Sequence, residues 1–214
     1  MDNKTQILTL MAGLLLVTML TSCRSQPPPA SDYWLPVDRT GQVLAADALG
    51  DHHCIFDTRT GLMWEAKRLQ PGPHHAGDTY SWHDPDPNSH AGDAGLIDGG
   101  ECSIARCDTD ALVSAVNQAG LCGHHDWMLP GREQLMTLGD RRLARSDGGS
   151  IDARFFPHDP SGEYWTSSTF RLYAQTAWVV DSRLGLDRTE LKTEPRPARL
   201  VRRHAPPAGH RSNE

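Results

Sequence analysis

The five cysteines of this chain constrain its fold more than any other feature, and Cys23 must be assigned first. It follows an apolar run over Ile7–Leu20, which is shorter than the about 20 apolar residues of a membrane-spanning helix and typical of a secretory signal. The residues Leu20-Thr21-Ser22-Cys23 match a bacterial lipobox. The sequence therefore predicts a lipoprotein signal peptide over residues 1–22 and a lipid on Cys23. An ordinary signal peptide with a coincidental cysteine is the alternative.

The segment after Cys23 predicts where the anchored chain is held. Arg24 stands where many Gram-negative lipoproteins of the inner membrane carry aspartate, so the outer membrane of a Gram-negative bacterium is expected. The proline-rich stretch within residues 23–48 indicates a tether. Polyproline chain rises about 3.1 Å per residue, so such a tether holds a domain roughly 20–30 Å from the bilayer. The membrane, reached through the lipid, is thus the first predicted partner.

The other four cysteines are Cys54, Cys102, Cys107 and Cys122, an even set in an exported chain. An oxidising compartment favours disulfides, and four cysteines allow three pairings. Cys102 and Cys107 flank a short turn and are expected to meet first, which leaves Cys54 for Cys122. The other two pairings stay open. A zinc site is disfavoured because no pair of cysteines is separated by two residues.

Hydrophobic patterning predicts an α+β domain over residues 49–204, with a disordered tail over 205–214. A β-hairpin is expected over Cys54–Lys67, and a long ordered loop over Arg68–Arg106. Asp108 and Thr109 predict the N-cap of a helix over Asp110–Ala119 that ends at Gly120. The remaining expected elements are a short strand within Trp34–Leu49, a helix over Gly131–Leu138, and strands over Glu163–Ser168, Thr176–Asp181, Asp187–Lys192 and Ala198–Arg203.

A series of strings in chain order resembles the Lcl C-terminal domain family, which is named after the C-terminal domain of the Legionella collagen-like protein. The strings are Cys54-x-x-Asp57-x-x-Thr60-Gly61-Leu62-Met63-Trp64-Glu65, Tyr80-Ser81-Trp82, Cys107-Asp108-Thr109, Asn117-x-x-Gly120-Leu121-Cys122-Gly123-x-x-Asp126-Trp127-x-Leu129-Pro130-x-Arg132-Glu133, Phe156-Pro157, Tyr164-Trp165-Thr166-Ser167-Ser168 and Arg199-Leu200-Val201-Arg202. Two residues depart from the pattern. Met128 replaces the usual arginine before Leu-Pro, and Gly131 replaces the usual threonine cap.

The resemblance implies a C-type-lectin-like fold, with small antiparallel sheets, two helices and a long ligand-carrying loop. The named adhesin domain binds sulfated polysaccharides, so a polysaccharide or an envelope protein is the second expected partner. The sulfatase-modifying-factor branch of the fold includes oxidases that use a late cysteine pair. Because no cysteine follows Cys122, that chemistry is not expected here.

No catalytic motif and no cofactor site is predicted from the sequence. The histidine doublets His52-His53, His74-His75 and His124-His125 do not favour a metal site, because neighbouring residues on a strand point to opposite faces. The acidic loop residues Asp78, Asp84, Asp86, Asn88, Asp93 and Asp98 match no calcium motif and favour a solvated loop, with calcium as the alternative. A net charge of −6 excludes nucleic acid as an expected partner.

Ligand-binding candidates come from the long loop and the arginine-rich C-terminal half. Trp82 is the candidate ligand-facing ring because its loop has few apolar residues, and an anchor for the loop is its alternative role; Trp64, Trp127, Trp165 and Trp178 are expected in the core. The predicted binding residues are Tyr80, Trp82, Asp84, Asn88, Arg183 and Arg199. A sulfated ligand would need a basic patch drawn from Arg183, Arg188, Lys192, Arg196, Arg199, Arg202 and Arg203.

Three functions follow from these features. The first is a non-catalytic binding domain on an envelope lipoprotein, with a glycan as the expected ligand. The second is a structural or partner-binding lipoprotein without a small ligand. The third is an enzyme related to sulfatase-modifying factors.

Overall fold

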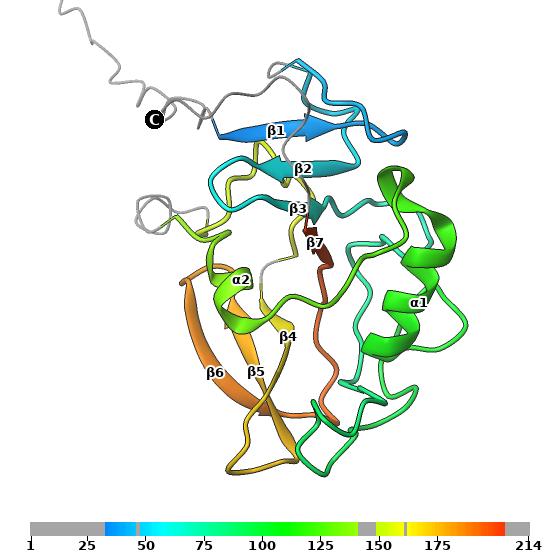
Figure 1. Cartoon of the computed structure of the whole chain (residues 1–214), viewed down its shortest axis with the longest axis vertical. Helices are drawn as coiled ribbons and strands as arrows, with labels where there is room; N and C mark the ends of the chain where they lie inside the picture. Colours follow the sequence, from blue (N-terminus) through cyan, green and yellow to red (C-terminus); the bar gives the residue numbers. More distant parts are fainter. Residues whose placement is uncertain (1–32, 46–47, 141–148, 161, 204–214) are drawn as a thin grey trace, which may run out of the picture. The chain divides into compact units, whose positions relative to one another are not determined.

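The computed structural model describes residues 33–45, 48–140, 149–160 and 162–203. The predicted signal peptide, Cys23, the proline-rich stretch that follows it and the predicted tail lie outside the described residues. Within the described part, two antiparallel sheets and two α-helices confirm the predicted α+β class (Figure 1).

The first sheet contains four strands in the order β1-β2-β3-β7, each antiparallel to its neighbours. Its strands are β1 (Trp34–Val37), β2 (Cys54–Asp57), β3 (Leu62–Glu65) and β7 (Val201–Arg203). The predicted hairpin is present as β2 and β3, and Gly61 turns it with a φ of 67°. β7 is shorter than predicted because the Leu200 N–H donates to the Glu65 carboxylate.

The second sheet contains β4 (Glu163–Thr169), β5 (Thr176–Asp181) and β6 (Leu186–Leu191) in that order. β5 has the predicted bounds, and β4 and β6 differ from prediction by one residue at their ends. Figure 1 shows this sheet beside α2 (Arg132–Met136), while α1 (Thr109–Ala119) lies on the opposite side of the domain.

The two α-helices begin and end close to the predicted residues. Asp108 caps α1 by accepting a hydrogen bond from the Ala111 N–H, and Gly120 ends it with a φ of 66°. A 3-10 turn (Leu121–Gly123) follows α1. α2 is shorter than predicted, yet both predicted inward residues, Leu135 and Leu138, are buried.

Side chains that alternate along the strands divide the core into two clusters. Phe56 and Met63 pack with α1 and the long loop, whereas Ile55 and Trp64 pack with α2 and the region around Phe156. Both faces of the first sheet are therefore covered, which explains why all residues of β2 and β3 are buried. Trp178 departs from prediction: it is only partly buried, against the Arg132 guanidinium at 4.2 Å from its ring centroid.

Both disulfides form as the preferred pairing predicted. Cys54 in β2 is bonded to Cys122 after α1, and Cys102 is bonded to Cys107 within the long loop. The long loop between β3 and α1 is ordered, and isolated bridges join it to the rest of the domain at Tyr80 and Ser81. Within the described residues, no helix is both long enough and apolar enough to span a bilayer.

Candidate functional site

A cavity of about 290 Å³ lies where the long loop meets the start of α1. The loop contributes Trp82–Pro85, α1 contributes Thr109, Asp110 and Val113, and β4 contributes Ser167. Met128 and Leu129, from the segment between the helices, complete the wall. The lining therefore combines apolar side chains with two carboxylates, two hydroxyls and an imidazole.

Trp82 fixes the loop beside this cavity. Its indole is fully buried and donates from Nε1 to the Thr166 carbonyl at 2.8 Å. The Lys192 ammonium lies 4.0 Å from the ring centroid and donates to the carbonyls of His90 and Asp93. The backbone N–H of Trp82 donates to the Lys192 carbonyl. These contacts support the alternative role of Trp82 as an anchor for the loop. Because Trp82 also lines the cavity, its role as a ligand-facing ring stays a prediction.

Tyr80 and Asp78 hold the beginning of the loop in a similar way. The Tyr80 side chain is fully buried and donates to Asp78, which also accepts from the Ser103 N–H and hydroxyl. Burial and the nearby Asp78 carboxylate raise the pKa of Tyr80 well above its ordinary value. Tyr80 therefore has a structural position and no exposed ring for a ligand.

Asp84 and Asn88 lie in an exposed part of the loop. Asp84 accepts from the Asp86 N–H and from Ser89, and Asp86 accepts from the Asn88 N–H and its side-chain amide. The carboxylates of this stretch thus satisfy local backbone donors, as in Asx turns. Asp84 lines the cavity, whereas Asn88 is not among the residues of its wall.

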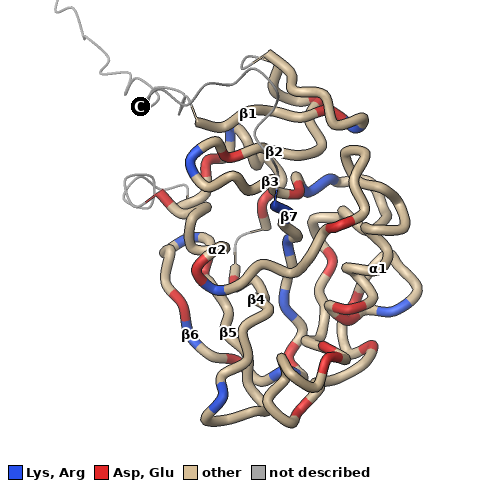
Figure 2. The backbone as a smooth tube through the Cα atoms, in the orientation of Figure 1, with Lys and Arg blue, Asp and Glu red and all other residues tan. Residues whose placement is uncertain are grey.

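The predicted basic patch is largely neutralised by acidic neighbours, and Figure 2 shows Lys and Arg interspersed with Asp and Glu along this part of the chain. Arg188 and Arg196 share the carboxylates of Glu163 and Glu190. Three further members pair individually: Arg183 with Asp181, Arg199 with Asp159, and Arg202 with Asp126. Lys192 donates to the carbonyls of His90 and Asp93 instead.

Two predicted arginines of the binding set are not among the residues that line the cavity. Arg199 is 1% exposed and donates to the Glu65 carbonyl at 2.6 Å, so burial removes it from any ligand surface. Arg183 is exposed in the turn between β5 and β6. The structure therefore brings none of the predicted arginines to the cavity wall.

Three side chains that the sequence did not single out for binding meet at the cavity edge. The imidazole of His83 lies close to the carboxylates of Asp108 and Asp110, with one ligand atom from each within 4.8 Å of the others. The Thr109 hydroxyl joins the two segments, because it donates to the His83 carbonyl and accepts from the His83 N–H. His83 lies within the long loop and Asp108 at the start of α1, so only the fold brings them together.

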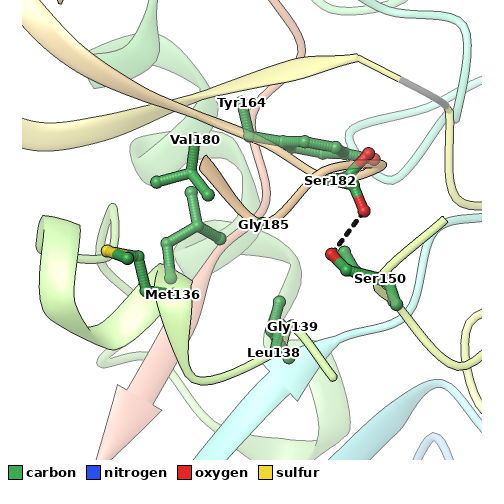
Figure 3. Close-up of a pocket in the computed structure, with 10 residues that line it drawn as sticks. Met136, Leu138, Gly139, Ser150, Tyr164, Val180, Ser182 and Gly185 are labelled. Atoms are coloured by element: carbon green, nitrogen blue, oxygen red, sulfur yellow. Dashed lines mark hydrogen bonds between the residues drawn. The ribbon is translucent and has the colours of Figure 1, made fainter. Parts of the chain in front are cut away.

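A second cavity, between α2 and the second sheet, is far smaller. Figure 3 shows apolar side chains such as Met136, Leu138 and Val180 around it, with the Ser150 hydroxyl donating to the Ser182 carbonyl at 2.6 Å. Its volume is about 10 Å³, which is close to the minimum for one water molecule. It is a packing gap in the core.

Comparison with known families decides the assignment. The model of the Lcl C-terminal domain matches residues 53–202. The chain belongs to the Lcl C-terminal domain family. No curated protein and no solved structure matches the chain. The match thus covers β2, β3, the second sheet, both helices and every residue of the larger cavity from Trp82 to Ser167, whereas β1 precedes it.

Proposed function

We propose that this protein is an envelope-anchored, non-catalytic binding domain that takes an uncharged glycan segment in the cavity of about 290 Å³ beside α1. The observation that carries the proposal is the composition of the cavity wall. Binding pockets are concave, largely apolar and equipped with a few convergent polar groups. Among the cavities lined by described residues, this cavity best meets these criteria.

The wall suits the two surfaces of a sugar ring. Val113, Met128 and Leu129 offer apolar contact to the C–H face of a ring. Asp84 and Asp110 offer acceptors to its hydroxyl groups, and Ser167 can donate or accept. A pyranose presents this mixture of C–H groups and hydroxyls.

A sulfated glycan fits the wall less well. The residues that line the cavity include no Lys or Arg, but they include the carboxylates of Asp84 and Asp110. Met128 stands where the family resemblance leads to an arginine, so this chain lacks a basic side chain at that point of the wall. Carboxylates would repel sulfate at short range. We therefore extend the family's expected ligand class to uncharged sugars for this chain.

A glycan-array screen of the purified full chain in detergent tests this proposal. Val113→Phe narrows the cavity, and we expect it to weaken binding by about tenfold, since contacts in a shaped pocket carry most of the affinity. Leu172→Phe is the matched control because Leu172 is 81% exposed in the turn between β4 and β5. Absence of any bound glycan, or equal binding by Val113→Phe, would reject the proposal.

A second candidate function is the docking of an envelope protein, and the free edge of β6 favours it. Leu186 and Leu191 on this edge strand are 62% and 46% exposed, and Leu184 in the preceding turn is 56% exposed. Exposed apolar edges are sites of protein association. A photo-crosslinker at Leu186 in living cells should then capture a specific protein that a crosslinker at Arg59 does not.

A further inference from the structure

We propose that His83, Asp108 and Asp110 form a binding site for a borderline divalent transition cation of the Zn²⁺ class. The three residues supply one imidazole nitrogen and two carboxylates, whose ligand atoms lie within 4.8 Å of one another. His83 and Asp110 also line the cavity beside α1, so the site is at the cavity's edge. No histidine of the three doublets takes part.

The position of the His83 Nδ1 atom is the second observation behind the site. This atom is buried and has no hydrogen-bond partner. The nearest paired carboxylate oxygen, Oδ1 of Asp108, is 3.9 Å away, which is too long for a hydrogen bond. Ligand atoms on one tetrahedral Zn²⁺, each at about 2.0–2.2 Å from the metal, lie roughly 3.3 Å apart. The observed separation is therefore closer to a pair of metal ligands than to a hydrogen-bonded pair.

The surrounding contacts hold the Asp108 side chain and the His83 backbone before any metal binds. Asp108 has a fully buried side chain that caps α1 through the Ala111 N–H and accepts from the Asp98 N–H. The reciprocal hydrogen bonds between Thr109 and the His83 backbone fix the imidazole segment against the helix. Each carboxylate oxygen keeps a second lone pair for a metal.

The local charge shows that a cation is accepted at this helix start. The positive end of the α1 dipole opposes a cation, but the two carboxylates outweigh it. The Arg106 guanidinium already lies there, with Nε 3.6 Å from Asp108 and Nη2 3.6 Å from Asp110. Neither distance is a hydrogen bond, and the Arg106 side chain is 47% exposed, so it can withdraw when a metal binds.

The ligand set selects the class of cation. Imidazole is a good ligand for zinc, copper, iron and nickel, whereas calcium takes oxygen ligands. Three protein ligands leave a fourth tetrahedral position open. Because His83 and Asp110 line the cavity, that position faces the space in which we place the glycan. This last role rests on the proposed function; the metal site itself does not.

Isothermal titration of ZnCl₂ alone into the purified full chain, first treated with EDTA, tests the metal site. We expect about one strongly bound Zn²⁺ that is weakened at least about tenfold in His83→Ala and in Asp110→Asn, since each removes one ligand. His125→Ala is the matched control, because His125 is exposed and outside the cavity wall. Arg106→Gln should tighten Zn²⁺ binding by removing the competing cation.

Near-UV circular dichroism confirms that each variant is folded. Absence of stoichiometric Zn²⁺ binding, or binding unchanged in both His83→Ala and Asp110→Asn, overturns the metal site. A repeat of the glycan screen with Zn²⁺ and with EDTA separates the two proposals. Zn²⁺ binding without any glycan supports the metal site and rejects the proposed function, and glycan binding without Zn²⁺ affinity does the reverse.

Discussion

At the scale of single residues, Glu65 is the most consequential side chain in the core. It is fully buried, and its Oε1 atom lies 3.0 Å from the Lys67 ammonium and 2.9 Å from His74 Nδ1. Its Oε2 atom accepts from the Leu200 N–H at 2.9 Å. One carboxylate thereby joins β3, the long loop and the segment before β7.

Glu65→Gln should lower the free energy of unfolding by about 3 kcal/mol, because it leaves the 4%-exposed Lys67 without its counter-charge. Urea denaturation measures this loss. Arg183→Ala, which removes an exposed pair with Asp181, serves as the control and should cost less than about 1 kcal/mol. In Glu65→Gln/Lys67→Met the loss should be smaller than the sum of the two single losses, since the buried charges disappear together. Equal losses for Glu65→Gln and Arg183→Ala would contradict the prediction.

The same carboxylate predicts a dependence of stability on pH. Burial by itself raises the pKa of Glu65, but Lys67 and His74 outweigh it and lower the pKa to about 2. A lowered folded-state pKa gives stability that is complete above the unfolded value near 4.5 and is lost as the pH falls toward 2. The difference in unfolding free energy between the wild type and Glu65→Gln should therefore narrow by roughly 2 kcal/mol between pH 7 and pH 3. If this difference in unfolding free energy stayed constant between pH 7 and pH 3, the lowered pKa of Glu65 would be refuted.

At the scale of elements, the start of α1 depends on one side chain. Asp108→Ala removes the cap on the Ala111 N–H and the acceptor of the Asp98 N–H. We expect a loss of about 2 kcal/mol in unfolding free energy, since caps contribute about 1 kcal/mol and a buried donor is left unpaired. Asp110→Ala, which affects only a partly exposed charge in the first turn, should cost about 0.5 kcal/mol. Urea denaturation in EDTA compares them, and similar losses would argue against the cap.

The elements themselves were largely predictable because their signals are local. Asp108 and Gly120 mark the ends of α1, and Gly61 marks the hairpin turn, since each fixes backbone geometry by its own side chain or by the lack of one. The prediction that Trp178 lies in the core was wrong, because alternation along a strand indicates the face of the sheet on which a side chain lies but not what packs against that face. There, Arg132 covers the ring in place of an aliphatic core.

The site was less predictable because its residues come from distant segments. His83 has no sequence signal of a ligand, and Asp108 has the signal of a helix cap only. The fold of the long loop brings these residues together, and the only sequence signal for that fold is the pair Cys102 and Cys107 before α1. Trp82 was predicted at a ligand surface because its loop is poor in apolar residues, yet Lys192 and Thr166, both remote in sequence, close over the ring.

At the scale of the whole molecule, the two disulfides act over different lengths of chain. Cys54–Cys122 spans 68 residues and connects the central β2 to the end of α1, so it encloses the entire long loop. Cys102–Cys107 spans five residues inside that loop. Both close the chain on the same side of the core, but only the first ties the first sheet to the helix that borders the cavity.

This difference predicts an order of stability. A cross-link removes entropy from the unfolded chain in proportion to the logarithm of the loop length, about 4 kcal/mol for the longer loop and about 2 kcal/mol for the shorter. Cys54→Ala/Cys122→Ala should therefore lose about twice the unfolding free energy of Cys102→Ala/Cys107→Ala in urea. The shorter bond should instead act locally: its removal should speed amide exchange around Asp98, whose carboxylate accepts from the Cys107 N–H, with little change in β2. If the short bond proved the more costly to remove, the long loop would have to be the chief source of stability in the fold, and the cysteine pair across β2 and α1 would be secondary.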